Sequence, residues 1–233
     1  MKFIKKIKFK SFEDIKKALD KCFVLHAVPQ IDIEPKSFYL ECINYIGRPF
    51  YSEENLITKN KTGELWSEIK YDKEKASSFS YSNTRQPFHT DGAYESNSPD
   101  LSFFYCIKKA DFGGATTFID PKILIKCLSF YDKNLLEKIK NTKIDHFKGN
   151  DKKTAPILGE NNDWNWNYFR ANKNEVVEDF HNFLEEIVYK SSLYNSVLLN
   201  PNEALFFWDR KVLHGRNSFL GNRHLIKCGI FLD

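Results

Sequence analysis

Two histidines and one aspartate have the residue types and spacing of a metal-binding site. His89 and Asp91 lie two residues apart in the segment Gln86–Gly92, and His214 follows much later, in the segment Trp208–Arg216. Side chains two residues apart on a strand point to the same face, so His89 and Asp91 can converge on one ion. Two histidines and one carboxylate on one face of a metal leave its other positions open, as in non-haem Fe(II) oxygenases. A His-x-Asp pair with a purely structural role is the alternative, and the spacing alone does not decide between the two.

Arginine is rare in this lysine-rich chain, and half of its arginines lie close to His214. The six are Arg48, Arg85, Arg170, Arg210, Arg216 and Arg223. A guanidinium binds a carboxylate through two parallel hydrogen bonds, whereas a lysine ammonium is a point charge, so this concentration favours a carboxylate-binding site. For Arg210 and Arg216, pairing with neighbouring acids such as Asp209 is an equally good explanation. Arg223 differs because it opens an apolar strand, where an unpaired cation is costly to bury.

Three blocks of sequence together resemble the taurine catabolism dioxygenase family. Within that family the likeness is greatest to the branch of gamma-butyrobetaine and trimethyllysine dioxygenases. The blocks follow one another in the family's order over roughly residues 64–232, and they are Phe88–Asp91, Gly113–Thr116, and Phe207–Arg216 with Arg223–Leu225. The residues before them match the family only loosely.

The resemblance implies an oxygenase that uses Fe(II), 2-oxoglutarate and O2, built on a double-stranded β-helix, the jelly roll of clavaminate synthase-like enzymes. It makes His89, Asp91 and His214 the catalytic iron ligands. It assigns Thr116, in the Gly-Gly-x-Thr turn, a hydrogen bond to the distal carboxylate of 2-oxoglutarate, and Arg223 the salt bridge to that carboxylate. The expected reaction hydroxylates a C–H bond of an amino acid, a betaine-like compound or a biosynthetic intermediate, and it releases succinate and CO2.

Five further residues are candidate substrate contacts. Strand alternation places Lys227 on the same face as Arg223. By the resemblance, the taurine enzyme has an arginine at this position that binds the anionic group of its substrate, and the lysine here departs from that pattern. A solvated lysine near the strand end is the alternative. The other four lie beside a motif or in the segment before the longest helix, and rim or packing roles are their alternative: Arg85, Tyr94, Trp166 and Arg170. The remaining histidines are expected to be structural or to face away from the site: His26, His146, His181 and His224.

The elements that must position these residues are short strands flanked by helices. Apolar residues at helical spacing predict helices over 12–19, 37–46, 123–128, 135–139 and 175–189. Aromatic and β-branched runs bounded by Pro and Gly predict strands over 22–28, 65–69, 78–81, 101–107, 116–119, 196–199, 203–208 and 225–232. The polar stretch 148–165 is expected to be a surface loop or lid. The pattern predicts a mainly β fold with flanking helices, closed or in two sheets.

Length and composition favour a globular protein that acts on small molecules. A chain of 233 residues suits one domain, in which residues 1–62 form a cover of helices and strand and residues 63–233 form the core, with an insert at about 129–192. The net charge of +4 is scattered and argues against nucleic acid as a partner. The basic N-terminus lacks the apolar run of a signal peptide, and no stretch is apolar enough to span a membrane. Five cysteines without a CxxC pair indicate reduced thiols and a cytoplasmic location.

Three other functions remain open. The same cofactors can support desaturation, cyclisation or another oxidative outcome, because the fate of the substrate radical depends on geometry that the sequence does not show. The chain can also be a metal-binding module without turnover. A dioxygenase that modifies protein or nucleic acid would need a shallow, basic, open groove beside the metal, whereas a narrow pocket favours a small-molecule substrate. The sequence indicates no oligomeric state.

Overall fold

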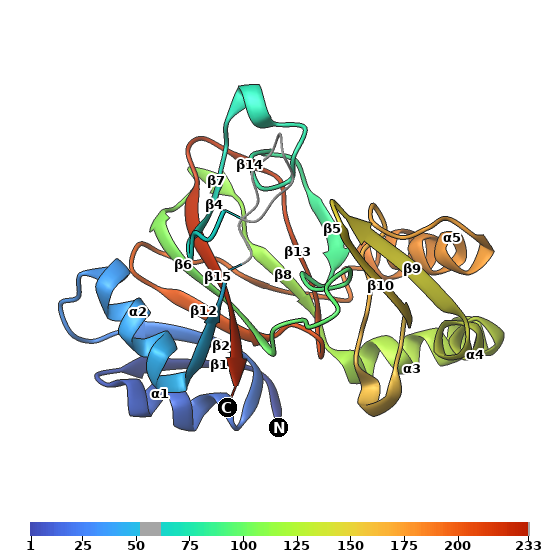
Figure 1. The fold of residues 1–233 in the computed structure, drawn as a ribbon, viewed down its shortest axis with the longest axis horizontal. Helices are drawn as coiled ribbons and strands as arrows, with labels where there is room; N and C mark the ends of the chain where they lie inside the picture. The colour runs from blue at the N-terminus through green and yellow to red at the C-terminus, as the bar shows by residue number, and fades with distance from the viewer. Residues whose placement is uncertain (52–61, 233) are drawn as a thin grey trace.

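The centre of the molecule is a pair of β-sheets that pack face to face. The computed structural model describes residues 1–51 and 62–232 (Figure 1). Within these residues the larger sheet has seven strands: β1 (Lys2–Phe9), β2 (Cys22–Pro29), β12 (Ala204–Trp208), β6 (Leu101–Lys108), β15 (His224–Leu232) and β3 (Gly47–Phe50) in that order, with β4 (Ser67–Lys70) also paired to β15. The smaller sheet has the order β11 (Asn195–Val197), β8 (Thr116–Ile119), β13 (Leu213–Arg216) and β5 (Gln86–His89). The expected two-sheet β fold with helical cover is confirmed.

Aromatic side chains fill the space between the two sheets. Phe118 of β8 packs against Phe207 of β12, with ring centroids 5.1 Å apart, and Phe207 meets Phe104 of β6 at 5.2 Å. All three are buried. Successive residues of a strand face opposite sides of its sheet, so these rings fix which residues of each strand point inward, toward the other sheet.

Two N-terminal helices cover the outer face of the larger sheet. They are α1 (Phe12–Leu19) and α2 (Pro35–Ile46), and their buried residues Ile15, Tyr39 and Cys42 pack in one cluster with Phe103 and Phe206. A capping box between Ser11 and Asp14 starts α1, as the sequence predicts.

The N-terminal segment is also part of the sheet itself, and not only its cover, because it supplies β1, β2 and β3. The sequence analysis did not anticipate β1, whose lysines hide its alternating pattern. It pairs in parallel with β2 at the edge of the sheet. Lysines on such a strand discourage pairing with another chain.

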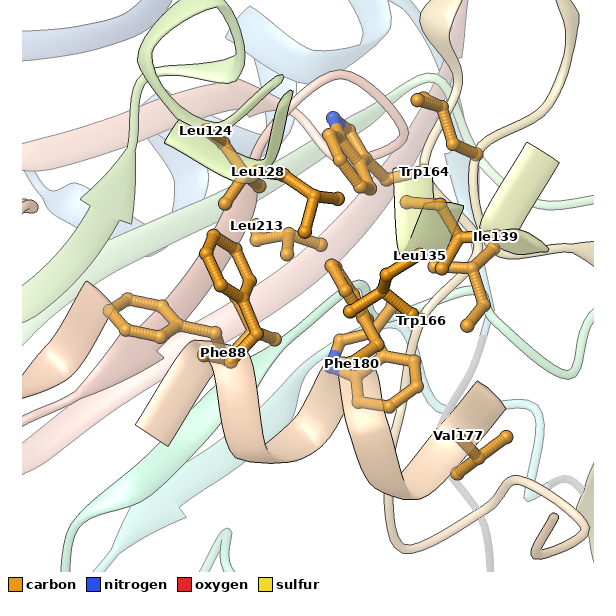
Figure 2. Close-up of a cluster of buried hydrophobic side chains, with 14 of the residues drawn as sticks. Phe88, Leu124, Leu128, Leu135, Ile139, Trp164, Trp166, Val177, Phe180 and Leu213 are labelled. Carbon is orange, nitrogen blue, oxygen red and sulfur yellow. The ribbon is translucent and has the colours of Figure 1, made fainter. Parts of the chain in front are cut away.

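A helical insert covers the outer face of the smaller sheet. Between β8 and β11 lie α3 (Pro121–Tyr131), α4 (Lys133–Asn141), the hairpin strands β9 (Lys143–Lys148) and β10 (Asp151–Pro156), α5 (Glu175–Asn182) and a π-helix (Phe183–Tyr189). Figure 2 shows Phe88 of β5 and Leu213 of β13 within the buried cluster of the insert, near Leu128, Trp166 and Phe180. Because Phe88 and Leu213 face the insert, the next residues, His89 and His214, face the interior between the sheets.

Two expectations about local structure are wrong. Residues 78–81 form turns instead of a strand; the Tyr81 N–H donates to the Ser78 carbonyl at 2.9 Å. Residues 148–165 are not simply a loop, because much of this stretch belongs to the β9–β10 hairpin, whose turn contains Gly149 at φ 58°. Strand β10 alternates exposed and half-buried residues, most of them polar, so its sequence carries no apolar period.

The remaining short elements are 3₁₀ turns at Lys73–Lys75 and Glu160–Asn162 and the paired strands β7 (Phe112–Gly113) and β14 (Phe219–Leu220). All five cysteines are unpaired and four are buried. Among the described residues, no helix combines the length and the apolar character that crossing a membrane requires.

Candidate active site

The structure brings His89, Asp91 and His214 into one cluster at the end of the space between the sheets. Their candidate ligand atoms all lie within 4.8 Å of one another. His89 and His214 are register partners on β5 and β13, with ring centroids 4.3 Å apart. The Nε2 atom of each lies 3.7 Å from a different oxygen of Asp91. Two imidazole nitrogens and one carboxylate that converge in this way form a donor set suited to a transition metal.

Neighbouring groups set the orientation of the His89 ring. Its Nδ1 lies 2.9 Å from the Pro87 carbonyl, which can only accept, so Nδ1 carries the proton. The Gln86 side-chain amide lies 3.0 Å from Nε2. This tautomer leaves one lone pair on Nε2, which accepts a hydrogen bond from the Gln86 amide here and which a metal ion would bind in place of that amide.

Asp91 lies just beyond the end of β5, so the strand argument that pairs it with His89 holds only in part. Its carboxylate accepts hydrogen bonds from Ser102 Oγ at 2.9 Å and from Lys227 Nζ at 2.5 Å, both from the larger sheet. Burial opposes the ionisation of Asp91, but Lys227 and His214 outweigh it and hold its pKa well below the usual range. Asp91 is therefore a charged carboxylate, ready to bind a cation.

Asp209 is a site residue that the sequence analysis treated only as a partner for arginine. It is fully buried and accepts hydrogen bonds from the backbone N–H groups of Asp91, at 2.9 Å, and Gly92, at 3.1 Å. Its Oδ1 also lies 3.7 Å from Nδ1 of His214. Burial and the charge of Asp91 raise the pKa of Asp209 to about 6. One carboxylate thus supports both segments that carry the cluster. The only indication of this role in the sequence is that Asp209 lies five residues before His214, within the block Phe207–Arg216.

We expect Asp209→Ala to weaken Fe(II) binding about 10- to 100-fold, because residues that orient metal ligands typically contribute that much. In this variant the backbone N–H groups of Asp91 and Gly92 lose their acceptor, and Nδ1 of His214 loses its neighbouring carboxylate. Anaerobic calorimetric titration with Fe(II) measures the effect. Asp163→Ala is the matched control, since Asp163 pairs with Arg210 and Lys211, away from the cluster. Equal Fe(II) affinity in both variants would contradict this role.

The cluster opens into a cavity of about 650 Å³ between the larger sheet and two loop segments. His89 and Asp91 lie in its wall, and three of the predicted substrate contacts also line it: Tyr94, Arg170 and Lys227. Arg170 and Phe169 come from the segment between β10 and α5, and Phe79 from the turns after β4; Phe79 and Phe169 meet with ring centroids 5.1 Å apart.

Arg85 and Trp166 are not among the described residues that line the cavity. Arg85 forms an ion pair with Glu185 and lies 4.1 Å from the centroid of the Tyr189 ring. Trp166 is fully buried in the insert cluster (Figure 2). These positions give both side chains packing roles, in keeping with the alternative stated for them.

Thr116 and Arg223 lie together beside the cluster. Both are buried, and both line a small pocket with Gly114 and Cys106. Burial, together with the nearby charge of Arg216, lowers the pKa of Arg223 to about 9. Its Nη1 has no hydrogen-bond partner in the part of the chain that the structure describes. A Cβ on Gly114, which has φ 74°, would come within 3.0 Å of Arg223 Cδ, so glycine leaves room for this side chain. A buried guanidinium with an unused donor fits a carboxylate ligand.

The other histidines lie outside the cluster. His26 pairs with Glu203 at 2.9 Å, His181 stacks on Tyr168, and His224 Nε2 lies 3.5 Å from Glu68. His146 is fully buried, and its Nε2 accepts from the backbone N–H of Asn167, at 3.4 Å. Asn167 lines the cavity, so His146 supports the cavity wall from behind.

We expect His146 to make folding sensitive to acid. Burial lowers its pKa from 6.5 to about 4. Because the folded pKa lies below the unfolded one, the stabilisation is fully present above about pH 6.5 and is lost as the pH falls toward 4. The difference corresponds to about 3 kcal/mol of unfolding free energy. Urea denaturation at several pH values should give a flatter pH dependence for His146→Gln than for the unaltered protein. If the unfolding free energy of both proteins changed with pH to the same extent, His146 would not be the source of the acid sensitivity.

Comparison with known sequences places this architecture in a family. Residues 10–228 match the family model described as Taurine catabolism dioxygenase TauD, TfdA family. The chain is 25% identical over 176 residues to 3-((Z)-2-isocyanoethenyl)-1H-indole synthase from Fischerella ambigua (strain UTEX 1903). That alignment covers 64% of this chain and 64% of the relative, so the chain spans just under two thirds of the curated protein that it matches.

Solved structures share the fold. Asparagine oxygenase in complex with Fe(II), 2S,3S-3-hydroxyasparagine and succinate superposes with a TM-score of 0.72 at 15% identity, over 94% of this chain and 77% of that one. PvcB from Pseudomonas aeruginosa superposes with a TM-score of 0.71 at 15% identity, over 98% of this chain and 86% of that one. These similarities confirm the expected clavaminate synthase-like jelly roll. Because residues 10–228, nearly the whole chain, match the family model, this chain belongs to the taurine catabolism dioxygenase TauD, TfdA family.

Proposed function

We propose that this chain is an Fe(II)- and 2-oxoglutarate-dependent oxygenase that hydroxylates an amino-acid-like small molecule. The observation that carries the proposal is the convergence of His89, Asp91 and His214 beside a cavity of about 650 Å³, in a member of a dioxygenase family. Two solved relatives support it. The asparagine oxygenase structure holds Fe(II), a hydroxylated amino acid and succinate. PvcB is described as an Fe, alpha-ketoglutarate dependent oxygenase, and alpha-ketoglutarate is 2-oxoglutarate.

The residues present fit both cofactors. His89, Asp91 and His214 offer the two nitrogens and one carboxylate that hold Fe(II) in such enzymes. Arg223 and Thr116 offer a buried cation and a hydroxyl for the distal carboxylate of 2-oxoglutarate. When bound, iron and 2-oxoglutarate use O2 to supply the oxidant that removes a hydrogen atom from the substrate, with release of succinate and CO2.

The protein's own contribution is orientation and exclusion of water. Asp209 and the Pro87 carbonyl hold the ligands, while Lys227 and Ser102 keep the Asp91 carboxylate charged and directed at the cluster. Phe79 and Phe169 of the cavity wall offer apolar surface that a bound substrate would cover, which would limit water around it.

The charges in the cavity suit a substrate that carries both signs. Lys227, Arg170 and Lys148 supply positive charge, and Glu68 and Glu95 supply negative charge. An amino acid presents a carboxylate and an ammonium group that can pair with such a set. Lys227, next to Asp91, is our candidate for the substrate carboxylate, with Tyr94 and Arg170 on the wall. The cavity volume of about 650 Å³ is in the usual range for small ligands, which favours a small molecule over a macromolecule.

A desaturating outcome is the second candidate function. The product named for the curated relative carries an ethenyl group, and PvcB is described as part of an isonitrile synthetic pathway. The same cofactors serve both outcomes, and the position of the substrate C–H bonds decides between them. The likeness to the gamma-butyrobetaine and trimethyllysine dioxygenase branch, and a cytoplasmic location, remain predictions from the sequence.

Substrate-dependent formation of succinate tests the proposal. Iron-loaded protein with 2-oxoglutarate and O2 is incubated with each common L-amino acid, with gamma-butyrobetaine or with trimethyllysine, and succinate and substrate mass are measured. We expect at least one amino acid to stimulate succinate formation and to gain one oxygen atom, whereas loss of two hydrogen atoms would indicate desaturation. Asp91→Ala is the inactive control. If the iron-loaded protein consumes no 2-oxoglutarate under any condition, the oxygenase proposal is wrong and the inactive metal-binding module is favoured.

A further inference from the structure

Two buried arginines, Arg216 and Arg223, both lie against the ring of Phe219 and close to Thr116. Their exposed fractions are 3% and 5%. Their guanidinium carbons lie 5.3 Å and 5.7 Å from the centroid of the Phe219 ring. Arg216 comes from β13, two residues after His214, and Arg223 directly precedes β15 of the other sheet. The two cations therefore approach each other across the space between the sheets.

No carboxylate among the described residues pairs with either arginine at ion-pair distance. Arg216 donates from Nη1 to the Phe79 carbonyl at 3.0 Å and from Nη2 to the Thr84 carbonyl at 2.8 Å. Its Nε, like Nη1 of Arg223, has no hydrogen-bond partner in the described chain. Burial lowers the pKa of Arg216 to about 10. Two neighbouring buried cations without a counter-charge are costly, so the site is built for an anion.

The strand register shows where that anion would lie. Arg216 is the direct cross-strand partner of Thr116, so their side chains share one face of the smaller sheet. His214 and its partner Phe118 lie on the same face, one two-residue repeat away, which is about 7 Å along a strand. In 2-oxoglutarate, three carbon–carbon bonds separate the keto carbon from the distal carboxylate carbon. A molecule whose keto-acid end lay at the metal cluster beside His214 would therefore have its distal carboxylate near Thr116, Arg216 and Arg223.

We propose that Arg216 is a second arginine that binds the distal carboxylate of 2-oxoglutarate, opposite Arg223. This inference rests on the proposed function and adds a residue to it. The hydrogen bonds from Arg216 to the Phe79 and Thr84 carbonyls fix the plane of its guanidinium group. The Nε–H group remains to donate to the distal carboxylate. Phe79, one of the two carbonyl partners, belongs to the turns that form one cavity wall. Cosubstrate binding at Arg216 is thereby linked to the wall of the substrate cavity.

The test compares two keto acids that differ only at the distal end. 2-Oxopentanoate has the same chain length as 2-oxoglutarate but a methyl group where the distal carboxylate would be. Iron-loaded protein is titrated anaerobically with each acid, and the dissociation constant is read from visible absorption. The variant is Arg216→Met, with Arg216→Lys as a second variant that retains the charge if the first is poorly folded. Arg210→Met is the matched control, because Arg210 pairs with Asp100 and Asp163.

We expect Arg216→Met to weaken 2-oxoglutarate binding about 10- to 100-fold, the size of a lost charge-assisted hydrogen bond. Binding of 2-oxopentanoate should change less than about threefold, and Arg210→Met should bind both acids like the unaltered protein. Equal weakening of both acids would show that Arg216 acts only through the fold of the wall, and would overturn the proposal. Unchanged 2-oxoglutarate binding would also overturn it. If the unaltered iron-loaded protein bound no 2-oxoglutarate, the proposed function itself would fail.

Discussion

His214→Ala is expected to remove Fe(II) binding and, with it, all substrate-dependent formation of succinate. His214 is buried on β13 and offers Nε2 to a cluster in which no other described histidine can replace it. Loss of one of three protein ligands should exceed the 10- to 100-fold effect of a residue that only orients a ligand. His89→Ala should behave in the same way, because the two rings face the same carboxylate.

Metal content after anaerobic loading, followed by calorimetric titration, measures this effect. His181→Ala is the matched control, since His181 stacks on Tyr168 away from the cluster and should leave Fe(II) affinity unchanged. A double variant of His89 and His214 that still bound iron and turned over would show that the cluster is not the metal site.

Arg223→Met should also have a large effect, a loss of 2-oxoglutarate affinity of about 10- to 100-fold. The substitution removes a buried guanidinium whose Nη1 has no partner in the described chain, but it keeps an unbranched side chain against Phe219 and Gly114. Fe(II) affinity without 2-oxoglutarate should not change, because Arg223 is not a ligand.

Anaerobic titration of the iron-loaded variant with 2-oxoglutarate gives the dissociation constant. Calorimetry with Fe(II) alone is the control for the integrity of the metal site. An Arg223 variant with the 2-oxoglutarate affinity of the unaltered protein would reject the role that the resemblance assigns to this residue.

The metal cluster could be predicted because scarce residue types stood at an informative spacing, but its geometry could not. The i and i+2 argument for His89 and Asp91 assumes that both lie on a strand, whereas β5 ends at His89. The position of Asp91 depends instead on Asp209, which accepts from its backbone N–H. Such a contact joins residues more than one hundred positions apart, and nothing local in the sequence reports it.

The same limit explains why two of the candidate substrate residues, Arg85 and Trp166, do not line the cavity. Arg85 precedes the β5 motif, and its neighbours gave no sign that its partner would be Glu185 in the π-helix. Trp166 lies in the same segment as Arg170, yet a turn closed by the Arg170 N–H and the Asn167 carbonyl separates them, so Trp166 is buried in the insert core while Arg170 lines the cavity. Helices with a clear apolar period, such as α5, were predictable because local sequence determines them. The edge strand β1 was not predictable in this way, because its lysines hide the alternation and it is defined by its pairing with β2.

Anaerobic visible absorption of the Fe(II)-loaded protein, before and after addition of 2-oxoglutarate, tests the central claim most directly. A bound keto acid that chelates ferrous iron gives a metal-to-ligand charge-transfer band. We predict that this band appears with the unaltered protein and is absent in His89→Ala. If no band forms, and analysis shows that the protein retains no iron, then His89, Asp91 and His214 are not an iron site and the oxygenase assignment is contradicted.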